Sequence, residues 1–205
     1  MHRDVFFRVH TARRLVALTF DDGPFPTYTP AVLALLRDTG AHATFFLVGK
    51  RAQARPDIVR AILAGGNEVG NHTWSHARLT SLLNFEQIQE IHRGAAALKT
   101  FGLRPAWFRP PYGAISRLGV LDADAIGERT ALWTFAVDKA LRIWGRNAAS
   151  EILARVRPGD IILCHDARPK QLNLFRRLID GLEERGYGVV TLSELVGTAS
   201  LPPAA

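Results

Sequence analysis

The sequence is poor in the residues and runs that mark several protein classes. It has one cysteine, Cys164, among 205 residues. An internal disulfide is therefore excluded, and a cysteine-based zinc site is not expected. No apolar run approaches the roughly 18 residues of a membrane-spanning helix, so we expect no membrane span. The opening MHRDVFFRVHTARR lacks the apolar core of a signal peptide, so the chain as written carries no export instruction and its compartment stays open.

The positive charge is not concentrated in any one segment. The net charge of +7 suits an anionic surface such as an acidic glycan or a cell wall. The absence of a dense basic block argues against a nucleic-acid partner. Hydrophobic content of 47% and charged content of 22% are ordinary for a globular protein. The length fits one domain, so we expect residues 1–205 to form a single domain with its core at about 15–195. The oligomeric state is not indicated.

Strand-like and helix-like segments alternate along the chain. Strands are predicted at 15–20, 43–48, 67–72, 106–109, 131–137, 160–164 and 187–192. Helices are predicted at 29–39, 56–64, 85–101, 116–127, 147–156 and 171–185, with a last turn at 193–197. This alternation predicts an α/β fold with a parallel sheet and outer helices. About seven strands fall slightly short of an eight-fold barrel.

Polar residues follow most of the predicted strands. In chain order they are Asp21 and Asp22, His72 and His76, Arg109 to Tyr112, Asp138, and His165 with Asp166. Because the carboxyl ends of parallel strands share one face of the sheet, where sites are built, these groups should meet in space.

The acid pair and the two histidines have the chemistry of a metal site. Adjacent side chains on an extended backbone point in different directions, so one of Asp21 and Asp22 can bind a cation while the other exchanges protons. His72 and His76 are four residues apart, which on a helical turn places both imidazoles on one face. Two imidazoles and one carboxylate suit Zn²⁺, Co²⁺ or Fe²⁺ and leave positions open for water and substrate. The alternatives are a charged turn and two surface histidines.

Three further residues favour catalysis over a plain turn. Arg109 can pair with a carboxylate and hold it ionised. Tyr112 offers the first free backbone N–H after two prolines, which suits a developing oxyanion. His165 ends a buried strand as a candidate general acid, and Asp138 can orient it. Cys164 should face the opposite side and belong to the core.

TFDDGP, GNHTWSH, FRPPYG and ILCHD, in this order, resemble the polysaccharide deacetylases, the NodB-homology domains of carbohydrate esterase family 4. The resemblance covers about residues 15–195. It implies a distorted (β/α) barrel and metal-dependent removal of acetyl groups, usually from N-acetylglucosamine in chitin or peptidoglycan.

The resemblance also implies residue roles. Asp21 would be the catalytic base, and Asp22, His72 and His76 would hold a divalent metal, Zn²⁺ first. Arg109 would support Asp21, the Tyr112 N–H would stabilise the oxyanion, and His165 would protonate the leaving amine. The family's Asp-x-x-Asp-Trp element is altered. Asp138 fits its first acid, but Leu141 and Arg142 stand where the second acid and the tryptophan would be.

The substrate side is expected to use aromatic residues and the rigid turn. Pro111, Tyr112, Trp74 and Trp144 are predicted substrate contacts. Phe25, Tyr28 and Trp107 are further candidates to stack on sugars, with core packing favoured for Trp107 and Trp133. Three alternatives stay open: an O-deacetylase on acetylxylan or another acetylated glycan, a non-glycan amidase, and a catalytically impaired glycan-binding module.

Overall fold

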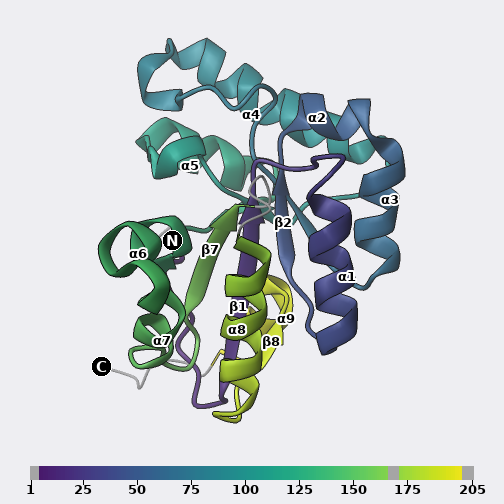
Figure 1. Cartoon of the computed structure of the whole chain (residues 1–205). Helices are drawn as coiled ribbons and strands as arrows, with labels where there is room; N and C mark the ends of the chain where they lie inside the picture. The colour runs from purple at the N-terminus through teal and green to yellow at the C-terminus, as the bar shows by residue number, and fades with distance from the viewer. Residues whose placement is uncertain (1–4, 166–170, 200–205) are drawn as a thin grey trace.

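The computed structural model describes residues 5–165 and 171–199. Within them, eight strands form one parallel sheet surrounded by helices (Figure 1). The hydrogen-bonded path runs β5-β4-β3-β2-β1-β7-β6, and β8 pairs with β1 off this path. The path forms a half-barrel, and the predicted distorted (β/α) barrel is confirmed.

The strands are β1 (Leu15–Asp21), β2 (Thr44–Leu47), β3 (Glu68–Asn71), β4 (Trp107–Phe108), β5 (Arg129–Thr130), β6 (Phe135–Ala136), β7 (Ile161–His165) and β8 (Gly188–Val190). The helices are α1 (Thr29–Thr39), α2 (Gly49–Ala54), α3 (Pro56–Ala64), α4 (Asn84–Lys99), α5 (Arg117–Ala125), α6 (Val137–Trp144), α7 (Ala148–Leu153), α8 (Leu172–Glu183) and α9 (Leu192–Val196). Short 3₁₀ turns lie at Leu79–Ser81, Pro111–Gly113 and Gly145–Asn147. No helix within the described residues is long and apolar enough to cross a membrane.

The central strand β1 organises the core and delivers the first site residue. Its side chains alternate between two faces. Val16, Leu18 and Phe20 enter the main core cluster under the outer helices, whereas Ala17 enters a second cluster. In Figure 1, α1 and α3 lie on one side of β1 and α6 and α7 on the other. The same alternation turns Asp21 away from the main cluster. Cys164 lies in that cluster, fully buried, as predicted.

The N-terminal segment joins two distant parts of the sheet. The Phe6 N–H donates to the Thr130 carbonyl at 2.9 Å, and the Val9 N–H donates to the Gly159 carbonyl at 2.8 Å. The segment therefore fastens the end of β5 to the residues before β7.

One predicted strand is wrong and two helices were not predicted. The run 131–137 was expected to be a single strand, but only Phe135–Ala136 is β6, and Arg129–Thr130 forms β5 just before it. Between them, the carbonyls of Ala131 and Leu132 accept hydrogen bonds from Arg109. Because side-chain donors occupy these carbonyls, the run does not continue as one strand. Helices α2 and α6 lie where no element was expected, while the other predicted elements end within three residues of the observed ones.

Candidate active site

The predicted catalytic and metal-ligating residues, except Arg109, line one cavity at the carboxyl ends of the strands. It has a volume of about 760 Å³. The residues that line it are Asp21, Asp22, His72, His76, Arg78, Tyr112, Trp133, Ala136, Asp138, Lys139, Arg142, Leu163 and His165. The expected convergence of polar groups from distant parts of the sequence is therefore present in the fold.

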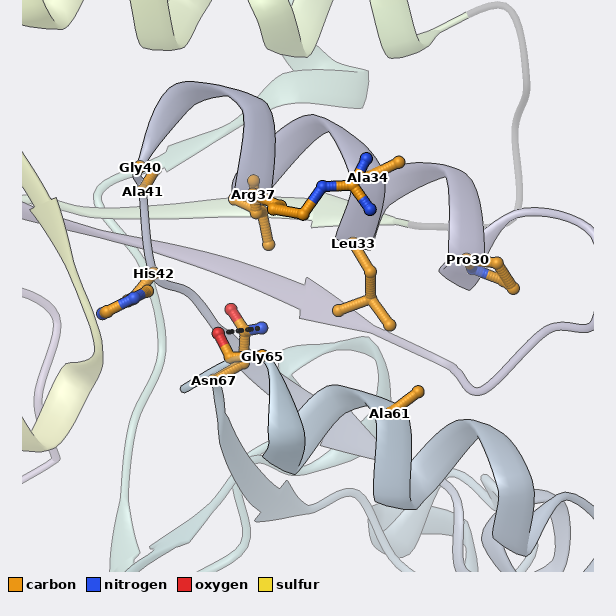
Figure 2. A pocket seen from close by; sticks show the side chains of 11 residues that line it. Pro30, Leu33, Ala34, Arg37, Gly40, Ala41, His42, Ala61, Gly65 and Asn67 are labelled. Carbon is orange, nitrogen blue, oxygen red and sulfur yellow. Dashed lines mark hydrogen bonds between the residues drawn. The ribbon is translucent and has the colours of Figure 1, made fainter.

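Another hollow, between α1 and α3, lacks this chemistry (Figure 2). It measures about 440 Å³. Small and aliphatic side chains dominate its wall, and Arg37 and His42 are the ionisable groups among the described residues that line it. Without a carboxylate, it offers no comparable metal or acid–base site.

Asp21 is buried beside a buried arginine. Its side chain is 4% exposed and that of Arg109 is 0% exposed, with Arg109 Nη1 at 2.7 Å from Asp21 Oδ1. The remaining guanidinium donors reach Thr19 Oγ1 at 2.8 Å and the carbonyls of Ala131 and Leu132 at 3.0 and 2.9 Å. Burial lowers the pKa of Arg109, while Asp21 acts to raise it. All three guanidinium nitrogens are hydrogen-bonded, and such additional hydrogen bonds help a buried ion pair to be tolerated.

Asp22, His72 and His76 form a second cluster next to this pair. Asp22 Oδ1 lies 2.8 Å from His76 Nε2 and 3.4 Å from His72 Nε2. One ligand atom from each residue lies within 4.8 Å of the others. The cluster unites the acid that follows β1 with the two histidines that follow β3.

The histidines do not lie on a helical turn, as their spacing led us to expect. They lie in the irregular segment after β3, where Thr73 and His76 have φ values of 65° and 68°. Asp22 also has a positive φ, 75°. Such left-handed conformations are uncommon for residues other than glycine, and they concentrate at functional sites. This backbone, rather than helical periodicity, brings the rings to a centroid separation of 5.0 Å.

The donor set fits a divalent metal ion. His72 Nδ1 lies 2.7 Å from the Arg109 carbonyl oxygen, which can only accept, so Nδ1 carries the proton and the Nε2 lone pair is free for an ion. Burial opposes ionisation of Asp22, but the neighbouring His72 and His76 side chains outweigh it and hold the pKa of Asp22 well below its usual range. An ionised carboxylate and two imidazoles are ligands that Zn²⁺ and related ions accept.

His165 and Asp138 form the opposite wall of the cavity. His165 Nδ1 lies 2.6 Å from Asp138 Oδ2, and Gln171 Nε2 donates to Asp138 Oδ1 at 2.6 Å. Burial lowers the pKa of His165, but the hydrogen bond to Asp138 and the charges of Asp21 and Asp22 outweigh it and raise the pKa. Asp138 thus favours the protonated ring. Asp166 lies outside the described residues.

The predicted substrate contacts are not all at the cavity. Tyr112 lines it, is 59% exposed, and lies edge-on to His76 with ring centroids 4.7 Å apart. Pro111, the preceding residue, is buried. Trp74 lies under the Arg93 guanidinium, and Trp144 packs on the main core cluster. Neither tryptophan is among the lining residues. Trp107 is fully buried, as expected.

Sequence reasoning missed six residues of the cavity wall, of which Ala136 and Leu163 are aliphatic and four carry a charged or aromatic side chain. Trp133 packs on the second core cluster, as expected, but it also lines the cavity. Arg78, Lys139 and Arg142 line the cavity as well. A signal for the last two was present, because Val137 and Ala140 are buried at helical spacing in the run VDKALRIW. That pattern predicts a helix whose other face carries Lys139 and Arg142.

Comparison with known proteins identifies the class to which this fold and site belong. A family model described as polysaccharide deacetylase matches residues 8–131. The chain is 36% identical over 199 residues to a peptidoglycan-N-acetylglucosamine deacetylase of Bacillus cereus, covering 94% of this chain and 92% of the relative. It is 34% identical to a chitooligosaccharide deacetylase of Azorhizobium caulinodans, covering 90% and 96%.

A solved structure agrees with these relatives. It is a mutant of a carbohydrate esterase family 4 pseudoenzyme from Bacillus anthracis, in which enzymatic activity was restored. It superposes with a TM-score of 0.89 at 26% identity, and the match covers 98% of this chain and 74% of the other. The chain belongs to the polysaccharide deacetylase family, carbohydrate esterase family 4. It is a polysaccharide deacetylase by class, a hydrolase, and this family generally uses a divalent metal ion.

Proposed function

We propose that the chain is a metal-dependent hydrolase that removes acetyl groups from glycans containing N-acetylglucosamine, such as chitooligosaccharide or peptidoglycan. The substrate class is supported by two relatives, a peptidoglycan-N-acetylglucosamine deacetylase and a chitooligosaccharide deacetylase. One observation carries the chemistry: an arginine-paired carboxylate, a three-ligand cluster and an acid-paired histidine line a single cavity.

Asp22, His72 and His76 would hold the ion, with Zn²⁺ as the first choice and Co²⁺ as an alternative. An ion bound there supplies Lewis acidity, which makes a water easier to deprotonate and an acetyl carbonyl more electrophilic.

Asp21 is the base that takes the proton of the attacking water. Its Oδ1 is occupied by Arg109 at 2.7 Å, whereas Oδ2 lies on the side of His72, 3.8 Å from Nε2. Oδ2 is therefore the atom that accepts the proton. Arg109 acts through Asp21, because its guanidinium fixes the orientation of the carboxylate through Oδ1 and leaves Oδ2 on the side of His72.

The Tyr112 main chain is suited to stabilise the oxyanion. Its positive φ of 62° turns the peptide at the cavity edge, and across residues 5–165 and 171–199 no acceptor is found for its N–H. A donor without an internal partner, aimed at developing negative charge, stabilises the transition state more than the ground state.

His165 supplies the proton that the leaving nitrogen needs. Its Nδ1 is held by Asp138 at 2.6 Å, so Nε2 is the ring nitrogen left for transfer. Asp138, Asp21 and Asp22 all raise its pKa, which favours the protonated ring that a general acid requires.

Acetate release from a chitooligosaccharide by zinc-loaded protein tests this proposal. Asp21→Asn should abolish turnover while metal content stays at the wild-type level, whereas His72→Ala should lose both. His42→Ala, at the outer hollow between α1 and α3, is the matched control and should change neither. Near-normal turnover by Asp21→Asn would remove its assignment as base.

Two other outcomes of these assays would favour two of the alternative functions. Release from acetylxylan but not from N-acetylated substrates would indicate an O-deacetylase. Metal binding without hydrolysis of any acetylated substrate would indicate an impaired glycan-binding module.

A further inference from the structure

Three basic side chains line the cavity without a role in the reaction just described. Arg78 comes from the segment after β3, and Lys139 and Arg142 come from α6. All three residues are exposed. The two on α6 are three residues apart, a spacing that places them on one face of the helix.

Each acid that lines the cavity has a basic partner, whereas these three basic side chains have no carboxylate partner among the described residues. Asp21 is paired with Arg109, Asp22 with the two histidines and Asp138 with His165. In the part of the chain that the structure describes, no carboxylate lies within ion-pair distance of Arg78, Lys139 or Arg142. Within residues 5–165 and 171–199, the rim of the cavity therefore carries positive charge that no carboxylate balances.

Among the described residues, no ion pair accounts for the presence of these three charges at the cavity. Side chains of the same sign in one cavity repel each other, and the repulsion is relieved when an anion enters. Arg78 is also positioned, since its guanidinium lies 4.8 Å from the centroid of the Tyr112 ring. Arg142 stands where the pattern of the resembled family has a tryptophan, and it lines this wall of the cavity.

We propose that this cavity selects acetylated glycans that carry a carboxylate next to the sugar being deacetylated, bound by Arg78, Lys139 and Arg142. The proposal rests on the function proposed above and narrows its substrate class. Arginine and lysine both bind carboxylates, and arginine can do so through two parallel hydrogen bonds. The carboxylate can come from a lactyl ether, as in muramic acid, or from a uronic acid.

Matched substrates that differ only in charge test the proposal. The first pair is an oligosaccharide of alternating N-acetylglucosamine and N-acetylmuramic acid with free lactyl carboxylates, and the same oligosaccharide with those groups as methyl amides. The second pair is an N-acetylglucosamine–glucuronic acid oligosaccharide and its methyl amide. The measured quantity is the ratio of kcat/KM for the acid to kcat/KM for the amide in zinc-loaded protein.

At low ionic strength the ratio should be about fivefold to tenfold for the preferred pair, because each exposed ion pair contributes a factor of roughly 1.5 to 5. It should fall towards one in about 0.5 M salt, where such pairs are screened. Which pair shows the effect identifies the source of the carboxylate. Equal rates for acid and amide in both pairs would overturn the proposal.

Charge reversal provides the internal comparison. The double substitution Lys139→Glu and Arg142→Glu should bring the ratio below one. Arg60→Glu, on the exposed face of α3 and outside the cavity, should leave both the ratio and the activity unchanged. A double variant that keeps the wild-type ratio would contradict the assignment of these two residues.

A binding measurement separates this inference from the proposed function. Calorimetric affinities of each acid and amide for the Asp21→Asn variant do not require turnover. Tighter binding of the acid with no hydrolysis by wild-type protein would support the carboxylate site and refute the deacetylase activity. Hydrolysis with equal affinities would refute the carboxylate site alone.

Discussion

Glu128 is hydrogen-bonded to the segment that carries His72 and is almost completely buried, with 2% of its surface exposed. Its Oε2 accepts a hydrogen bond from Asn71 Nδ2 at 2.8 Å, and Asn71 Oδ1 accepts from the Thr73 N–H at 3.0 Å. Glu128 thus supports the residues on both sides of His72. Burial raises the pKa of Glu128 to about 8, against the opposing effects of Asn71 and Lys99. We predict that Glu128→Gln removes a large pH dependence of stability.

The direction of the pH effect on stability follows from the raised pKa of Glu128. Between about pH 4.5 and pH 8 the carboxyl is ionised in the unfolded chain but protonated in the folded protein. The folded state therefore binds more protons, and the free energy of unfolding falls as the pH rises through this window. At about 1.4 kcal/mol per unit of pKa, the loss amounts to roughly 5 kcal/mol above pH 8. Glutamine stays neutral and keeps an acceptor for Asn71, so the variant avoids this loss.

Urea unfolding at about pH 5 and pH 9 measures the effect. Glu128→Gln should be close to wild type at the lower pH and more stable than wild type by up to roughly 5 kcal/mol at the higher pH. Glu183→Gln, an exposed carboxyl on α8, is the control and should follow wild type at both values. An equal change in unfolding free energy between the two pH values for wild type and Glu128→Gln would refute the reasoning.

The remaining predictions concern the groups around the cavity. Arg109→Met leaves Asp21 buried without its cation and should cost about 3–5 kcal/mol of unfolding free energy; a loss below about 1 kcal/mol in urea titrations would contradict the pairing. Asp138→Asn removes the group that raises the pKa of His165, so an NMR titration of this ring should show a lower pKa, and an unchanged value would disprove the coupling. Gly94→Ala should destabilise the protein by about 1–3 kcal/mol despite the helix preference of alanine, because a Cβ there would meet Asn71 Oδ1 and, at 2.7 Å, the Thr73 carbonyl carbon. The midpoint of thermal unfolding should fall, and a rise would show that Asn71 and Thr73 shift without cost to accommodate the Cβ.

Segments with marked ends were the most predictable from sequence. The predicted bounds of α1 and α3 are confirmed at both ends. Pro30 and Pro56 fix the first turns of these helices, and Gly40 ends α1 with a φ of 66°. Local residue chemistry decides such boundaries, so the sequence alone contains them.

Elements that depend on distant contacts were less predictable. The run 131–137 has strand-like composition, but its first carbonyls serve the side chain of Arg109, more than twenty residues earlier in the chain. Helix α6 begins at Val137, inside the strand-like run, and has no side-chain cap, so no local signal marks its start, although the burial of Val137 and Ala140 follows helical spacing.

The convergence of the site followed from topology alone. Parallel strands deliver their carboxyl ends to one face, and Asp21, His72 and His165 all line the same cavity there. The backbone that aims the ligands could not be predicted, since Asp22, Thr73 and His76 adopt positive φ without being glycine. Tertiary contacts hold those conformations, so no local sequence pattern predicts them.

The central claim is that Asp22, His72 and His76 share one ion next to Asp21. Anomalous diffraction at the zinc edge, from crystals of zinc-loaded protein, tests it most directly. The account predicts one strong peak about 2.0–2.2 Å from His72 Nε2, His76 Nε2 and an oxygen of Asp22. A fully loaded crystal with no peak at these three atoms, or with its peak elsewhere, would contradict it.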